Sequence, residues 1–222
     1  MFRSAVPYAR EAGIEEPLVC YQGAAVVEPA SGKFLLHEPI PLELAREAIA
    51  AVEEEGFALN CYVDDDLYVA KATENVRAYA GFQHLPVTEV GALLGWLERP
   101  PTKLVVVDDP DALDALKPRL LERFGGRLFI AKSLPHFLEL ASPMVSKGSG
   151  LGFLAEHLGF TAERTVAIGD GENDLELLAW AGYAVAVANA DDGLKATADW
   201  ICPDVDEEGV AQVLEGYLDS RA

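Results

Sequence analysis

Two segments of the sequence carry side chains that could bind a metal ion and a phosphorylated ligand. Asp170 and Asp174 lie in the acidic run GDGEND at 169–174, directly after the apolar residues 165–168. Mg²⁺ prefers carboxylate oxygens, and ligands of parallel α/β sheets collect beyond the carboxyl ends of the strands. Lys147 lies in SKGSG at 146–150, where glycines would let a phosphate oxygen approach a helix N-terminus.

Ordinary helix capping explains the acidic run equally well. Asn173 followed by Glu176 fits an N-cap with its capping-box partner, and Asp174 in the first turn suits the helix dipole. Lys147 alone could be an ordinary solvated lysine. The spacing therefore leaves metal binding and capping both open. The chain has no GxxxxGK[ST] loop, no HExxH or CxxC pairing and no GxSxG elbow.

The surrounding pattern predicts an α/β protein. Residues 26–140 mix helical and strand periodicity, including a helix from Pro110 that Pro118 should kink or shorten. From 165 onward, apolar strands at 165–168 and 183–187 alternate with amphipathic helices, which indicates a parallel sheet. The acidic run would then lie at the carboxyl edge of that sheet.

Composition narrows the range of partners. The 222 residues include 17 basic and 37 acidic side chains, a net charge of −20, and half of them are apolar. Such a chain can bury a core, and it lacks the basic face that nucleic acids or anionic membranes require. Its three scattered cysteines predict no disulfide framework, and neither a signal peptide nor a membrane span is visible. We therefore expect a cytoplasmic protein with buried cysteines; the sequence assigns no oligomeric state.

The order of three motifs resembles the haloacid dehalogenase superfamily. SKGS at 146–149, GDGEND at 169–174 and Ala188-Asn189-Ala190 follow one another as in its Cof-type phosphatases with a large α/β cap, class IIB. YQGA at 21–24 is similar to that branch's YNGA, and Gly150 replaces a usual alanine. The resemblance implies a Rossmann-like core with a parallel sheet, formed by 1–25 and 141–222, and an inserted α+β cap domain at 26–140.

The same resemblance implies roles for individual residues. Lys147 would hold phosphoryl oxygens, and Asp170 and Asp174 would bind or orient Mg²⁺. Asn173 would assist near the phosphate, and Asn189 would contact phosphate or substrate. The implied activity is Mg²⁺-dependent hydrolysis of small phosphorylated metabolites, in which positioning and charge neutralisation dominate.

Two motifs of the family do not occur in the sequence. The nucleophilic aspartate belongs to a DxDGT motif and a phosphate-binding Ser or Thr to a TGR-like motif, and neither precedes YQGA here. We therefore expect Met1 to be an internal residue of a longer protein, through a misplaced start, a fragment or a truncated gene. The parallel sheet would then lack its N-terminal strands. The alternatives are a non-catalytic protein that binds phosphate or Mg²⁺, and a structural α/β domain.

Overall fold

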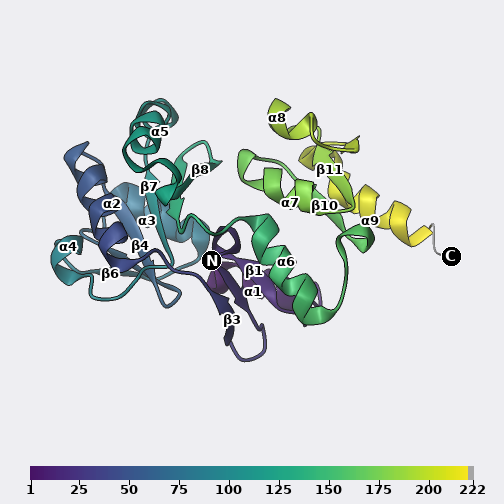
Figure 1. The fold of residues 1–222 in the computed structure, drawn as a ribbon, viewed down its shortest axis with the longest axis horizontal. Coiled ribbons are helices and arrows are strands. Elements are labelled where there is room, and N and C mark those ends of the chain that lie inside the picture. The colour runs from purple at the N-terminus through teal and green to yellow at the C-terminus, as the bar shows by residue number, and fades with distance from the viewer. Residues whose placement is uncertain (220–222) are drawn as a thin grey trace. The chain divides into compact units, whose positions relative to one another are not determined.

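The computed structural model describes residues 1–219 and confirms the α/β class. The chain forms two compact units that divide after Val145 (Figure 1). The core and cap boundaries expected from the sequence, 1–25 with 141–222 and 26–140, stay a prediction.

The first unit is built on a six-stranded mixed sheet with the order β6-β5-β4-β7-β9-β8. Its strands are β4 (Leu59–Val63), β5 (Asp66–Val69), β6 (Val87–Glu89), β7 (Lys103–Val107), β8 (Phe129–Leu134) and β9 (Phe137–Ala141). Neighbouring strands pair antiparallel except β5 and β6, which are parallel.

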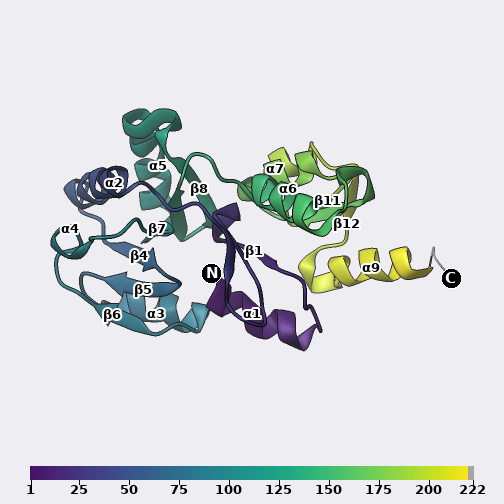
Figure 2. The same ribbon diagram turned by 60° about the horizontal axis from the view of Figure 1, so that its bottom comes forward.

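Helices cover both faces of this sheet, as Figure 2 shows. The helices are α2 (Leu42–Glu54) and α5 (Pro110–Phe124) on one face, α3 (Glu74–Gln83) on the other, and the short α4 (Leu93–Trp96). Successive strand side chains point to opposite faces. Cys61 of β4 therefore packs into the core with α2 and α5, while Tyr62 packs into the core with α3.

The N-terminal segment adds helix α1 (Phe2–Glu11) and a small antiparallel sheet. That sheet consists of β1 (Leu18–Cys20), β2 (Ala25–Val27) and β3 (Phe34–His37). The Asp65 carboxylate, in the turn between β4 and β5, accepts hydrogen bonds from the backbone N–H groups of Phe2 and Arg3 at 3.1 and 3.0 Å. A side chain more than sixty residues away thus caps α1, whose own N-cap residue is Met1.

A buried ion pair crosses the same unit. Lys103 Nζ of β7 lies 3.0 Å from Glu139 Oε1 of β9, and both side chains are buried. Ser133 and Gln22 donate further hydrogen bonds to the Glu139 carboxylate. Burial alone would raise the pKa of Glu139, but Lys103 and these donors outweigh it, so the pKa lies below its usual value.

The second unit, from Ser146 onward, contains a three-stranded parallel sheet with the order β10-β11-β12. Its elements are α6 (Lys147–Leu158), β10 (Val166–Gly169), α7 (Leu175–Trp180), β11 (Tyr183–Val187), α8 (Asp192–Lys195), β12 (Trp200–Cys202) and α9 (Gly209–Asp219). The predicted alternation of strands and helices is confirmed.

Some local expectations need correction. Pro118 does not shorten its helix: α5 continues past it to Phe124.

The segments that form α3, α4, β2, β3 and β6 gave no clear sequence signal. All three cysteines are free and buried, as expected.

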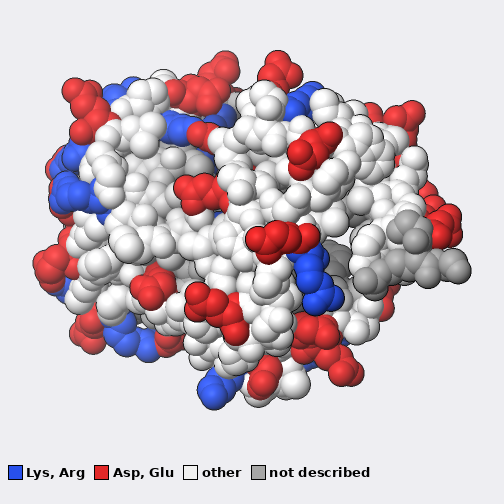
Figure 3. Space-filling view, turned by 45° about the vertical axis from the view of Figure 1, so that its right-hand side comes forward, with Lys and Arg blue, Asp and Glu red and all other residues white. Residues whose placement is uncertain are grey.

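Charge is spread over the surface. Figure 3 shows acidic side chains dispersed over the visible face, with fewer basic ones among them. Within residues 1–219, no helix combines the length and the apolar character that a membrane span requires.

Candidate functional site

The acidic run forms a tight loop at the carboxyl end of β10. The strand ends at Gly169, a turn of 3₁₀ helix covers Glu172–Asp174, and α7 begins at Leu175. Asp174 Oδ2 accepts hydrogen bonds from the backbone N–H groups of Asp170 and Gly171 at 3.1 and 3.3 Å. Asp174, rather than Asn173 as the sequence suggested, occupies the N-cap position of α7.

The structure brings Lys147 to this loop. Lys147 is the first residue of α6, and a reciprocal capping box between Ser146 and Ser149 fixes the start of that helix. The Lys147 Nζ atom donates a hydrogen bond to Asp174 Oδ1 at 2.5 Å. The Asp174 side chain is only 4% exposed, whereas Lys147 is 31% exposed. The ammonium group therefore connects a buried carboxylate to the surface.

Two glycines allow this close approach. A Cβ atom on Gly148 would lie 2.3 Å from the backbone oxygen of Glu176, so the start of α6 can pack against α7 only without a side chain there. A Cβ atom on Gly169 would lie 2.6 Å from Asp174 Cβ. The glycines of the two motifs therefore determine the position of Asp174 and Lys147.

The electrostatics of the loop disfavour the charged form of Asp170. Partial burial and then the neighbouring Asp174 charge raise the pKa of Asp170, and together they outweigh the opposite effect of Lys147. Two carboxylates that repel each other gain from a proton or a metal ion between them. Asp170 remains accessible to solvent, so an ion could reach it.

The donor set suits Mg²⁺ better than a metal that needs an all-protein cage. Among residues 1–219, no group of three or more His, Cys, Asp or Glu side chains is arranged to hold a metal. Mg²⁺ commonly takes only one or two protein carboxylates and completes its octahedron with water and substrate phosphate. Asp170 can supply one ligand of such a partial set, and Asp174, whose two oxygens accept from Lys147 and from the backbone N–H groups of Asp170 and Gly171, could add a second through a remaining lone pair.

The two predicted asparagines occupy different surroundings. Asn173 lies within the Glu172–Asp174 turn. Asn189 follows β11, and its Oδ1 accepts a hydrogen bond from the backbone N–H of Val205 at 3.3 Å. The carboxamide of Asn189 is thus oriented by the segment after β12.

Sequence reasoning missed one residue of the loop. Asp191 Oδ2 accepts from the backbone N–H of Glu172 at 3.0 Å, and the Asp191 N–H donates to the carbonyl of Asp170 at 3.2 Å. Asp191 therefore ties the acidic loop to the start of α8. An aspartate before a short helix was the available signal, and it reads as an ordinary cap.

Comparison with known proteins points to one family. A family model described as haloacid dehalogenase-like hydrolase matches residues 1–214. The crystal structure of TM0651 from Thermotoga maritima is 33% identical, with a TM-score of 0.79, over 97% of this chain and 81% of that one. A haloacid dehalogenase-like hydrolase from Bacteroides thetaiotaomicron is 27% identical, with a TM-score of 0.83, over 96% and 82%.

Curated relatives include named phosphatases. The 5-amino-6-(5-phospho-D-ribitylamino)uracil phosphatase YitU of Bacillus subtilis is 27% identical over 98% of this chain and 82% of its own length. The phosphoglycolate phosphatase of Archaeoglobus fulgidus is 40% identical over 44% of this chain and 42% of its own length. Several relatives match in this partial way, with less than half of their own length covered.

Proposed function

This chain belongs to the haloacid dehalogenase-like hydrolase family. We therefore propose that it functions as a Mg²⁺-dependent phosphohydrolase of small phosphorylated metabolites. The observation that carries the proposal is the Lys147–Asp174 contact beside Asp170, at the carboxyl end of β10. This contact places the Lys147 ammonium group, which could bind phosphoryl oxygens, beside the Asp170 and Asp174 carboxylates, which could bind a metal ion. Phosphatase names among the relatives support the same activity.

Each residue has a role in this proposal. Asp170 and Asp174 would hold a Mg²⁺ ion, which would supply charge neutralisation for the phosphoryl oxygens. Lys147 donates to phosphoryl oxygens while Asp174 holds its ammonium group in place. Asn173 and Asn189 donate amide hydrogen bonds to the phosphate or the substrate. Asn189 Nδ2 is the donating atom, and the Val205 N–H bonded to Oδ1 fixes the orientation of the amide.

We propose that the core of this enzyme comprises 1–25 and 141–222 and that 26–140 is the cap. The cap selects the substrate and excludes water from the phosphoryl group. The hydrophobic core on one face of the six-stranded sheet, which is formed by residues between 40 and 140 alone, supports a cap region of this extent.

The second candidate function is non-catalytic binding of phosphate or Mg²⁺. It is favoured by one observation, the lack of a DxDGT motif in the 222 residues. A covalent aspartyl-phosphate needs that carboxylate, whereas binding needs only Lys147 and the acidic loop.

One experiment separates the two candidates. The protein is assayed for phosphate release from p-nitrophenyl phosphate with MgCl₂ and with EDTA, and its melting temperature is measured in parallel. Mg²⁺-dependent release supports the hydrolase, and a Mg²⁺-induced rise in melting temperature without release supports binding alone. Neither response would contradict both. Reading the coding DNA upstream in frame shows whether DxDGT and TGR codons are present.

A further inference from the structure

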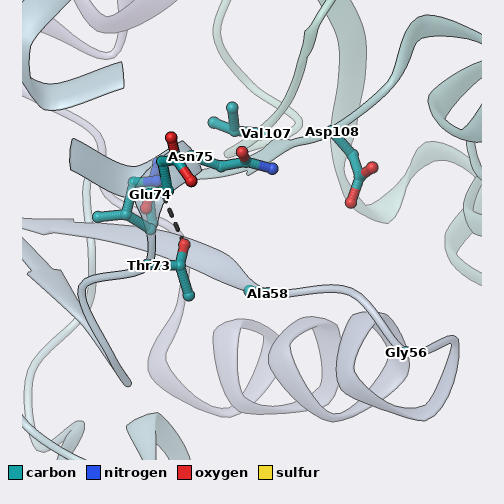
Figure 4. A pocket seen from close by; sticks show the side chains of 9 residues that line it. Gly56, Ala58, Thr73, Glu74, Asn75, Val107 and Asp108 are labelled. Carbon is teal, nitrogen blue, oxygen red and sulfur yellow. Dashed lines mark hydrogen bonds between the residues drawn. The ribbon is translucent and has the colours of Figure 1, made fainter. Parts of the chain in front are cut away.

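The first unit contains a hollow away from the acidic loop. It has a volume of about 320 Å³ and lies between the start of α3, the start of β4 and the end of β7. Figure 4 shows Glu74 and Asn75 at the α3 side and Asp108 across from them, with the Asn75 side chain extending toward Asp108. The remaining lining residues are Gly56, Ala58, Asn60, Thr73, Val76 and Val107. Its size falls within the range of about 300–1,000 Å³ typical of small-molecule sites.

Asn60 is the unusual residue of this hollow. It lies on β4, on the same face as Tyr62, and only 2% of its surface is exposed. Its Nδ2 atom is buried and has no hydrogen-bond partner. Buried polar groups in native structures almost always have a partner. A ligand in the hollow could supply a hydrogen-bond acceptor for Asn60 Nδ2. The Asn60 amide would reach it by rotating about χ2, a torsion with a broad energy minimum.

A second hollow adjoins the first and is aromatic. Its volume is about 490 Å³, and it shares Asn75, Val107 and Asp108 with the first. Tyr79, Phe82 and Phe137 line it, with ring centroids 5.0 Å apart for Tyr79–Phe137 and 6.0 Å apart for Phe82–Phe137. Phe82 is 61% exposed, so one face of its ring is open to a ligand. The ring planes are inclined by 89° and 53°, so a planar ligand ring could stack on one of these faces, and Phe82 is the most exposed of them.

The charges of the two hollows restrict the ligand. Glu74, Asp108 and Asp109 line them, the one basic side chain in the lining is His136, whose Nδ1 lies 3.0 Å from the Asp108 carbonyl oxygen, and none of the described lining residues is Lys or Arg. A phosphate group would therefore be repelled, whereas an N–H donor would be attracted. The Asp108 carboxylate is oriented, because its Oδ1 accepts from the Asp109 backbone N–H at 2.8 Å.

We propose that these two hollows bind an amino-substituted nitrogen heterocycle of the cytosine type. Its carbonyl oxygen accepts from Asn60, its exocyclic amine donates to Asp108, and its ring stacks on the Phe82 and Phe137 side. Asparagine amides and carboxylates are the groups that read such base edges elsewhere. The site does not depend on the phosphatase activity, because binding needs no turnover.

The test is a comparison of two nucleosides by isothermal titration calorimetry. Cytidine presents an amine where uridine presents a carbonyl oxygen, which the Asp108 carboxylate repels. We expect cytidine to bind at least tenfold more tightly than uridine. Equal affinities for the two, or saturable binding of neither, would overturn the proposal.

Two variants and a matched control sharpen this test. Asn60→Leu keeps the branched shape of the side chain and removes the unpartnered amide, so the free protein should melt at the same or a higher temperature while cytidine binding weakens at least tenfold. Phe82→Ala should weaken binding by about tenfold, because base–aromatic stacking is lost. Tyr8→Ala, at a residue that is 62% exposed on α1, should leave the affinity unchanged. A lower melting temperature of Asn60→Leu with unchanged affinity would instead assign Asn60 a structural role.

Discussion

Lys147 Nζ and Asp174 Oδ1 lie 2.5 Å apart, although 27 residues separate them in the sequence. The carboxylate is buried and the ammonium group is partly exposed. Removing either partner therefore has two separate effects, one on the stability of the second unit and one on any bound phosphate.

Lys147→Met should lower both stability and phosphate release. Asp174 would keep a buried charge without its cation, at a cost of about 1–3 kcal/mol in unfolding free energy, which urea denaturation measures. Phosphate release should fall at least ~10²-fold, because one transition-state charge stabiliser is lost. The control is Lys195→Met, at a lysine that lies 3.8 Å from an exposed Asp192. Equal effects of the two variants would contradict the role of Lys147.

Asp170→Asn should abolish Mg²⁺-dependent turnover and the Mg²⁺-induced rise in melting temperature. In EDTA the variant should melt at the same or a higher temperature, because the repulsion between Asp170 and Asp174 is removed. Differential scanning calorimetry with MgCl₂ or EDTA checks both expectations. Asp192→Asn, at a fully exposed side chain, is the matched control. A full Mg²⁺ response of Asp170→Asn would refute the metal assignment.

Gly148→Ala should destabilise the second unit by about 1–3 kcal/mol. The new methyl group meets the Glu176 backbone oxygen, which cannot move without shifting α7. Gly193→Ala is the control, because a Cβ atom there has no neighbour within 4 Å. Chemical denaturation should separate the two variants clearly, and similar midpoints would show that α6 and α7 tolerate a wider spacing.

The Lys103–Glu139 pair predicts an acid-sensitive first unit. The folded pKa of Glu139 lies below its usual value of 4.5, so its contribution to stability is complete above that pH and is lost as the pH falls through the folded pKa. Glu139→Gln should be less stable at neutral pH and should lose less stability on acidification. Melting temperatures between neutral and acidic pH test this, and parallel curves for both proteins would count against it.

The sequence predicted the parts of the site whose signals are local. The acidic run follows strand β10, and the SKGSG segment begins helix α6, as the pattern predicted. Both signals are local, because apolar periodicity and capping residues determine structure within a few neighbouring positions. The contact between Lys147 and Asp174 was not predictable in this way. It depends on the approach of α6 to α7, which a sequence pattern does not encode.

Other features were invisible for the same physical reason. Asn60 is one polar residue in an apolar strand, and only the structure shows that its amide has no partner. Helix α3 buries little of its surface, with Val76, Tyr79 and Ala80 inward, so its periodicity is weak. The cap of α1 by Asp65 joins distant segments and has no local signature.

The Asp65 contact with Phe2 and Arg3 also has a consequence for synthesis on the ribosome. At roughly 5–20 residues per second, several seconds pass between the synthesis of Phe2 and that of Asp65. During that interval the Phe2 and Arg3 amide groups lack the Asp65 carboxylate as a partner. The backbone amides at the start of α1 thus gain the Asp65 carboxylate only after the β4–β5 turn has been synthesised, so α1 docks well after its own translation.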